Sequence, residues 1–163
     1  MLKQVKRKRE EGFTIIEVLI VLAIAALILV IVFLAVPALQ RSSRNTQRKN
    51  DAANVLSAVS DYVSNNSGQP PAACSSTAGA FSGSGDCKFL QDVKLGYYNA
   101  SNATIKVVTS VPGSAPDTNT VDIITGAQCG TTAADNPTSS TNNRQYVAWY
   151  GIEGSTGAQC VEG

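Results

Sequence analysis

The chain contains no histidine among its 163 residues, and charged residues make up only 15% of it. Histidine is the commonest general base, so its absence excludes the usual Ser-His and Cys-His catalytic arrangements. A zinc site is also disfavoured, because no Cys-x-x-Cys pair occurs. Asp117, Asn119 and Asp122 are spaced like calcium ligands, but an ordinary turn before a strand explains them better. We therefore expect a non-enzymatic chain without a cofactor or a bound metal.

Charge is absent from one long segment, Val18–Leu39, and glycine is absent from Phe13 to Leu39. At about 1.5 Å per residue a helix over Val18–Leu39 spans roughly 33 Å, against a hydrocarbon core of about 30 Å. The apolar region of a secretory signal peptide is shorter and ends in a small-residue cleavage site. The segment is therefore predicted to be a transmembrane helix that stays in the mature protein, with Pro37 as its one kink site.

Basic residues flank this segment on both sides, so their distribution hardly decides its orientation. The leader, residues 1–12, carries Lys3, Lys6, Arg7, Lys8 and Arg9, and the following stretch carries Arg41, Arg44, Arg48 and Lys49. The cysteines decide it, because disulfides persist on the oxidising side of a membrane. We expect the leader in the cytoplasm and the C-terminal head outside it.

The four cysteines all lie in that head, at Cys74, Cys87, Cys129 and Cys160. Their even number indicates two disulfides, although four reduced thiols remain the alternative. Three pairings are possible. Pairing of Cys74 with Cys87 and of Cys129 with Cys160 closes the shortest loops and is favoured for that reason.

Beyond the membrane the helix is predicted to continue as an amphipathic half over residues 40–66. Its apolar positions recur at steps of three and four: Ala52, Val55, Leu56, Val59, Tyr62 and Val63. Gly68 and the prolines after it end the helix. Strands are expected at residues 104–111, 120–125 and 145–150. The predicted fold is α+β, with one long helix, its transmembrane part over 13–39, packed on a small antiparallel sheet in a globular head over 67–163.

The most specific motif is the run from Gly12 to Val18 between the basic leader and the apolar segment. Gly12, Phe13, Thr14 and Glu17, followed by an unbroken aliphatic helix, resemble the processing site of type IV pilins and type II secretion pseudopilins. The resemblance covers about the first third of the chain. It implies that a prepilin peptidase cuts after Gly12 and N-methylates Phe13.

Glu17 is the one carboxylate at the start of the apolar helix, where its burial is costly. No Lys or Arg lies in the helix after it until Arg41. A partner is therefore expected from headgroups, water or another chain, and the resemblance supplies one in the freed amine of Phe13 on a neighbouring subunit. The alternative is a carboxylate that simply reaches the membrane interface.

The resemblance further implies a structural subunit of a type IV pilus filament. Its expected partners are identical subunits in a homopolymer, the prepilin peptidase, the pilus assembly platform and motor, and the membrane before assembly. Few basic residues in the head argue against nucleic acid binding along the shaft. The precursor is expected in the inner or cytoplasmic membrane and the mature chain in an extracellular filament.

Two other readings fit the same residues. A minor pilin, or a pseudopilin of a secretion or DNA-uptake system, shares every N-terminal feature. A membrane-anchored binding domain that never polymerises needs the helix but not Gly12, Phe13 or Glu17. A further hypothesis places the basic stretch Arg41–Lys49 against acidic heads of stacked subunits, with exposure to water or anionic headgroups as its alternative.

Overall fold

The computed structural model describes residues 12–77, 86–98, 103–130, 136–154 and 157–163. The chain divides into two compact units, Met1–Leu39 and Gln40–Gly163. The basic part of the leader lies outside the described residues. The two units are described separately below, because their relative placement is not determined.

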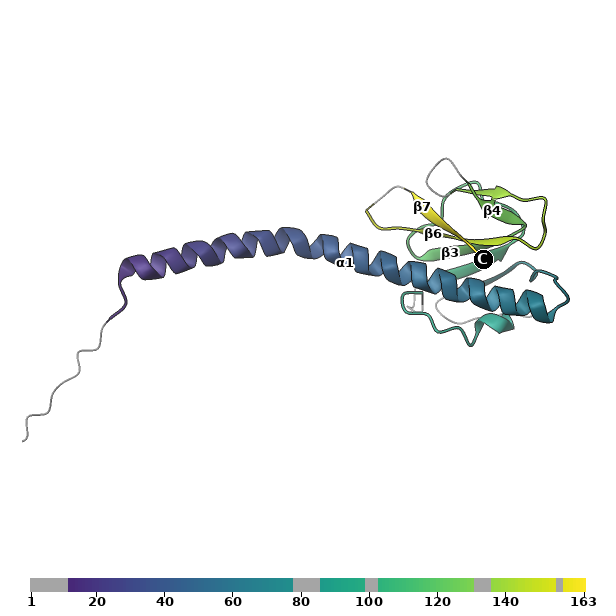
Figure 1. Ribbon diagram of the computed structural model, residues 1–163, viewed down its shortest axis with the longest axis horizontal. Helices are drawn as coiled ribbons and strands as arrows, with labels where there is room; N and C mark the ends of the chain where they lie inside the picture. Colours follow the sequence, from purple (N-terminus) through teal and green to yellow (C-terminus); the bar gives the residue numbers. More distant parts are fainter. Residues whose placement is uncertain (1–11, 78–85, 99–102, 131–135, 155–156) are drawn as a thin grey trace, which may run out of the picture. The chain divides into compact units, whose positions relative to one another are not determined.

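A single helix, α1, runs from Ile15 to Asn65 and contributes to both units (Figure 1). It continues through Pro37, so the proline does not end the helix; a loosening around Pro37 inside a filament stays a prediction. The predicted end is confirmed. Ser67 and Gly68 take positive φ angles of 57° and 81°, and the Gly68 N–H donates to the carbonyl of Val63 at 2.8 Å. This turn satisfies carbonyls that the last helical turn leaves open.

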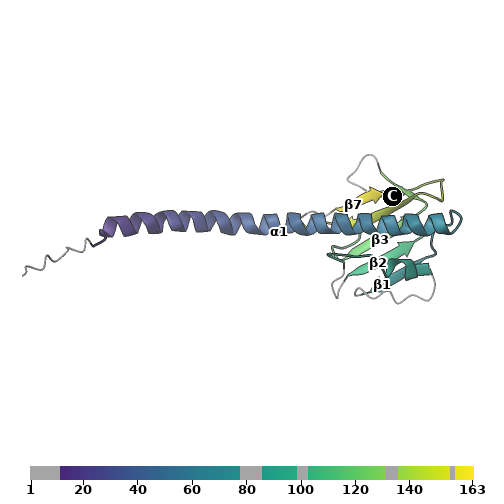
Figure 2. The ribbon, with the colours of Figure 1, turned by 60° about the horizontal axis from the view of Figure 1, so that its bottom comes forward.

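In the Gln40–Gly163 unit, α1 packs on a five-stranded sheet with the order β1-β2-β3-β6-β7. The strands are β1 (Cys74–Thr77), β2 (Thr104–Val108), β3 (Thr120–Thr125), β6 (Tyr146–Gly151) and β7 (Ala158–Glu162). In Figure 2 the helix crosses the sheet with β7 on one side of it and β1 and β2 on the other. The predicted α+β class is thus confirmed.

One detail of the sheet differs from the expected antiparallel arrangement, because β2 and β3 are parallel, with Thr104 opposite Thr120. The other neighbouring pairs are antiparallel. The chain leaves β2 at Val108, earlier than predicted, and returns through a loop that contains Pro112 and Pro116. Such a crossover is what a parallel pair requires, since a tight hairpin reverses strand direction.

The sheet is covered on both faces, which explains why β3 and β6 are buried almost throughout. On one face Val55 and Val59 of α1 pack against residues such as Ile123 and Ala148. The predicted apolar face of the helix is therefore confirmed: Ala52, Val55, Leu56 and Val59 are all buried. On the other face Ile124, Val147 and Trp149 pack with Ala127.

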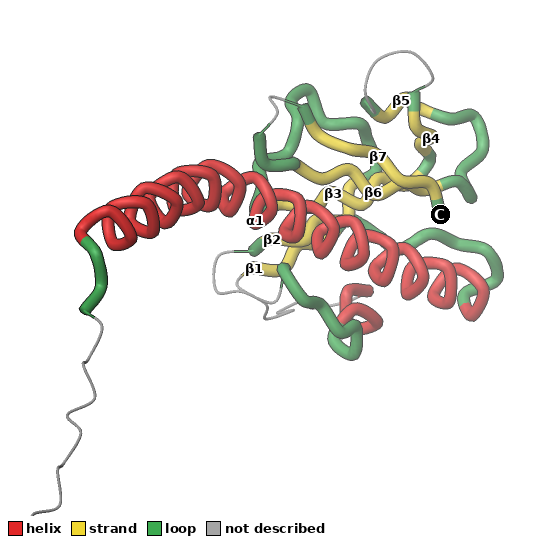
Figure 3. Tube along the Cα trace, turned by 60° about the vertical axis from the view of Figure 1, so that its left-hand side comes forward, coloured by secondary structure: helices red, strands yellow, loops and turns green. Residues whose placement is uncertain are grey.

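Ala127 belongs to a two-stranded ribbon of β4 (Ala127–Cys129) and β5 (Pro137–Ser139). Figures 1 and 3 show β4 on the far side of β6 from α1. The sequence did not predict this ribbon, nor β1, β7 or the 3-10 helix η1 (Asp86–Leu90).

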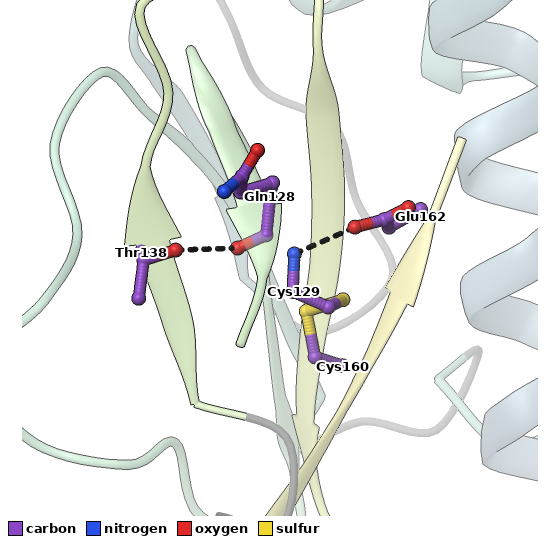
Figure 4. Close-up of a disulfide and its surroundings, with 5 residues drawn as sticks. All are labelled: Gln128, Cys129, Thr138, Cys160 and Glu162. Carbon is purple, nitrogen blue, oxygen red and sulfur yellow. Dashed lines mark hydrogen bonds between the residues drawn. A yellow bond between two sulfur atoms is a disulfide. The ribbon is translucent and has the colours of Figure 1, made fainter. Parts of the chain in front are cut away.

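The four cysteines form two disulfides, Cys74–Cys87 and Cys129–Cys160, which is the pairing favoured from the sequence. The first joins β1 to η1, and the second joins β4 to the edge strand β7. Figure 4 shows the second with its neighbours, where the Cys129 N–H donates to Glu162 Oε1 at 2.9 Å. Beside it the Thr138 hydroxyl donates to the Gln128 carbonyl at 3.4 Å. The disulfide and the Cys129–Glu162 hydrogen bond attach the ribbon to β7 of the main sheet, whereas the Thr138–Gln128 bond joins the two strands of the ribbon.

Candidate processing and assembly site

The segment expected to be processed is exposed in the Met1–Leu39 unit. Gly12 and Phe13 precede the helix, and a Cβ added at Gly12 would meet no atom within 4 Å. The Phe13 side chain is 88% exposed. The peptide bond between these two residues is therefore open to an enzyme that approaches the backbone closely, which a residue without Cβ makes easier.

Thr14 and Glu17 form a reciprocal cap at the start of α1. The Thr14 N–H and hydroxyl donate to Glu17 Oε2 at 2.9 and 2.6 Å, and the Glu17 N–H points back to Thr14 Oγ1 at 3.4 Å. Thr14 is the residue before the first helical turn, and Glu17 is the third residue of the helix. This is the capping-box pattern, in which each side chain satisfies a backbone donor that the helix leaves open.

The cap changes what the sequence indicated about Glu17. An external partner was expected for its carboxylate, yet Thr14 of the same chain supplies two donors. Both donate to Oε2, and the described residues offer no hydrogen bond to Oε1. A carboxylate has about four lone-pair positions, so the cap leaves Glu17 able to accept from a second partner. The pattern of Thr followed three residues later by Glu was visible in the sequence.

Among the described residues of this unit, no other segment covers the apolar part of α1. Its large apolar side chains between Phe13 and Leu39 are 40 to 88% exposed. Phe13, Val18, Val21 and Leu22 line a shallow apolar hollow of about 300 Å³ beside Glu17. Length and composition allow this helix to cross a membrane. Such a surface requires lipid or other apolar helices around it.

A second cluster, within the other unit, anchors the loop after β6 to α1 through Glu153. Arg44 donates to both Glu153 carboxylate oxygens, with distances of 2.5 to 2.9 Å, and Arg48 donates to Oε1 at 2.6 Å. Hydrogen bonds from Arg44 first, and then from Arg48, lower the pKa of Glu153 to about 2. Asn45 adds two hydrogen bonds to the Glu153 backbone, at 2.9 and 3.1 Å.

Arg48 is fully buried, and each of its three guanidinium nitrogens donates at least one hydrogen bond. It donates to the Thr118 carbonyl at 2.9 Å, to Asn45 Oδ1 at 2.8 Å and to the Tyr97 hydroxyl. The Tyr97 ring lies 3.9 Å from the guanidinium carbon. Arg48 therefore acts as a structural anchor. Removal of its anionic partner Glu153 would leave a buried, uncompensated charge, which is strongly destabilising.

Asp51 anchors a second loop in the same way. Its carboxylate, only 3% exposed, accepts from the backbone N–H groups of Gly96, Tyr97 and Tyr98 at 2.7 to 3.0 Å. The sequence analysis missed both anchors. Arg44, Arg48 and Asp51 continue the three- and four-residue spacing of the apolar face, and that spacing was the available signal.

These contacts also revise the hypothesis of a basic stretch directed at neighbouring subunits. Arg44 and Arg48 pair with Glu153 of their own chain. Arg41 and Lys49 remain exposed. Any contact of this stretch with an acidic neighbour therefore falls chiefly to those two residues.

Of the three residues spaced like calcium ligands, Asp117 and Asp122 line one hollow together with Lys106, whose positive charge disfavours a cation there, and Asn119 is not among the described lining residues. Asp117 Oδ1 accepts from the Asn119 N–H at 2.9 Å, as in an ordinary turn. Asp122 is 5% exposed on β3, its Oδ1 has no hydrogen-bond partner among the described residues, and burial raises the pKa of its carboxyl. Across the described residues no group of three acidic, cysteine or histidine side chains could hold a metal ion.

Comparison with known families identifies the N-terminal segment. Residues 7–33 match the model of the prokaryotic N-terminal methylation motif. No curated protein and no solved structure matches the chain. The matched region contains the exposed Gly12–Phe13 bond, the Thr14–Glu17 cap and most of the apolar helix. The chain thus carries the N-terminal methylation motif that is the signature of type IV pilins and pseudopilins.

Proposed function

We propose that the chain is the structural subunit of a type IV pilus filament, cut after Gly12, N-methylated at Phe13 and assembled through the apolar part of α1. The observation that carries this proposal is the combination of the matched motif with an uncovered apolar helix whose first turn is capped by Glu17. The role is structural, and the N-terminal segment supplies a substrate for the peptidase.

Cleavage changes the charge at the start of the helix. Hydrolysis of the Gly12–Phe13 peptide bond removes the basic leader and leaves an amine on Phe13. An α-amino group is largely protonated near neutral pH, and N-methylation keeps the nitrogen basic. The mature helix then begins with a cation on Phe13 and, four residues on, a carboxylate on Glu17.

These two opposite charges allow one subunit to bind the next directly, without an ion or lipid headgroup between them. Glu17 Oε2 is engaged by Thr14, whereas Oε1 can accept from the Phe13 ammonium of a neighbouring subunit. A carboxylate costs about 2.5–3.5 kcal/mol at the membrane centre and less near the interface, where Glu17 lies at the start of the helix, and a cationic partner offsets this cost. The shallow hollow beside Glu17 offers apolar contacts to the same neighbour. Packing of aliphatic side chains then replaces lipid contacts along the helix.

The head fits an exported, load-bearing module. Its two disulfides and the Arg44–Glu153–Arg48 cluster connect loops to the sheet and to the helix that would transmit force. These features favour a major pilin, with the head outside the cytoplasm. A pseudopilin or minor pilin is the second candidate, because the matched motif belongs to both groups.

The test is to express the chain in a host with its own pilus machinery and to label the head with an antibody. Long decorated surface fibres are expected for a pilin, and their absence together with correct processing would indicate a pseudopilin. Glu17→Gln should be processed and remain in the membrane but give few fibres. Lys88→Gln, which removes one charge from an exposed residue of η1 in the head, is the control and should leave fibres intact. Normal fibre yield from Glu17→Gln would refute the assembly role of the carboxylate.

A further inference from the structure

A polar groove lies at the end of the head where α1 terminates. It has a volume of about 580 Å³ and is formed by four separate segments: the turn after α1, the residues after β2, the β3–β4 turn and the β5–β6 loop. Hydroxyl groups line it, from Ser67, Thr109, Ser110, Thr125, Ser139 and Ser140. Its size is within the range of small-molecule sites and is too large for a single inorganic anion.

Arg144 provides the charge of this groove. The described lining residues include Arg144 but no acidic side chain, so the groove is locally cationic. The Arg144 guanidinium has no hydrogen bond to any described residue and is exposed. It differs in this respect from Arg44 and Arg48, both of which donate to the Glu153 carboxylate. A guanidinium free to bind a ligand is suited to a carboxylate, which it can hold through two parallel hydrogen bonds.

Gly68 allows the Arg144 side chain to lie across the groove. A Cβ at residue 68 would lie 2.9 Å from Arg144 Nη2 and 3.1 Å from Cζ, so a larger residue would displace the guanidinium. The φ of 81° at Gly68 also disfavours other residues. The absence of a side chain at Gly68 therefore determines the position of the Arg144 guanidinium in the groove.

The loop that carries Arg144 is held in place by its own hydrogen bonds. The Arg144 N–H donates to Asn142 Oδ1 at 3.0 Å, and the Asn142 N–H donates to Ser140 Oγ at 3.1 Å. The Ser140 N–H in turn donates to the Gly126 carbonyl at 2.7 Å, and Ser140 Oγ donates to the Gln145 side chain. The loop is thus fixed before any ligand arrives, which lowers the entropy lost on binding.

We propose that this groove binds an acidic sugar unit of a polysaccharide, with its carboxylate on Arg144 and its hydroxyls on the serine and threonine side chains. Hydroxyl and amide groups can both donate to and accept from sugar hydroxyls, and Gln69 and Asn143 add amides to the lining. The inference goes beyond the proposed filament role and does not need polymerisation, since the groove lies wholly within the Gln40–Gly163 unit.

The experiment is a titration of the full chain, ¹⁵N-labelled in detergent micelles, with glucuronic acid and with glucose, followed through the amide signals of Gly68, Gly126 and Arg144. Glucuronic acid should shift these signals saturably and bind at least about tenfold tighter than glucose, because a charge-assisted pair is added. Arg144→Gln should abolish this preference. Arg41→Gln removes the same charge from an exposed site away from the groove and should bind like the parent chain.

Several results would overturn the proposal. These are equal binding of the two sugars, an unchanged affinity in Arg144→Gln, or no saturable shift at the groove. Binding of inorganic phosphate as tight as that of glucuronic acid would also overturn it, since a bare anion site would then explain the data. Fibre formation is not a readout here, so the groove and the filament role can fail independently.

Discussion

Glu17 Oε2 accepts two hydrogen bonds from Thr14, one from the main-chain N–H at 2.9 Å and one from the hydroxyl at 2.6 Å. This pairing joins the residue expected to govern assembly to the residue that starts the helix. It orients the carboxylate at the N-terminus of α1, where a negative charge is favourable for the helix dipole.

The first prediction concerns this cap. Thr14→Val removes the hydroxyl and should destabilise the first helical turn by about 1 kcal/mol, whereas Thr14→Ser should retain the cap. Amide hydrogen exchange of residues 15–18 in micelles measures the effect. Exchange should speed up in the valine variant only. Equal exchange in the two variants would show that the hydroxyl does not cap the helix.

The second prediction concerns the acid stability of the head. The pKa of Glu153 is lowered from an ordinary 4.5 to about 2, so the folded chain holds this proton more weakly than the unfolded chain. The stabilisation is fully present above pH 4.5 and is lost as the pH falls to about 2. After allowance for partial exposure of the carboxylate, it is about 2 kcal/mol.

Denaturant unfolding at several pH values tests this. The free energy of unfolding of the parent should fall as the pH is lowered from 4.5 to 2. Glu153→Gln should be less stable than the parent at neutral pH, and its free energy of unfolding should change less over that pH range. The control is Asp61→Asn, at an exposed position of α1. A Glu153→Gln curve parallel to that of the parent would contradict the assignment.

The third prediction concerns Asp122, whose effect on stability with pH is opposite to that of Glu153. Burial raises the pKa of Asp122, with Lys106 opposing the shift, and no residue that the structure describes forms a hydrogen bond to its Oδ1. The folded chain therefore holds this proton more tightly, and Asp122 costs stability as the pH rises through the carboxyl range. Asp122→Asn should raise the free energy of unfolding at neutral pH by about 1 kcal/mol and have little effect in acid. A loss of stability at neutral pH would mean that the carboxylate has a partner.

The fourth prediction concerns the disulfides. Their cysteines are separated by 13 residues in Cys74–Cys87 and by 31 in Cys129–Cys160. Loop-closure entropy then gives about 3 kcal/mol for the first and nearly 4 kcal/mol for the second. Unfolding of the Cys74→Ser/Cys87→Ser and Cys129→Ser/Cys160→Ser double variants measures both. A Cys129/Cys160 variant as stable as the parent would show that the ribbon stays attached without its bond.

Local sequence patterns were sufficient to predict the buried face and the end of α1 and the positions of β3 and β6. The apolar spacing from Ala52 to Val59 marked the buried face of α1, and Gly68 marked its end. The runs at β3 and β6 were recognisable because they are rich in β-branched or aromatic residues, as expected of strands buried on both faces, although β3 also contains Asp122.

The remainder depends on tertiary contacts that local patterns encode weakly or not at all. Strand β7 is short and has a single β-branched residue, Val161, so its pairing with β6 and the Cys129–Cys160 bond hold it in the sheet. The parallel pairing of β2 and β3 follows from how the chain crosses between Val108 and Thr120. Arg48 and Asp51 resemble surface charges in the sequence, and only their loop partners explain their burial.

The central claim, that the N-terminal segment is a processed and methylated assembly signal, is tested most directly by the intact mass of the mature chain from a host with prepilin peptidase. The account predicts a chain that begins at Phe13 and carries one added methyl group on its amine. A mature chain that still begins at Met1 would contradict it.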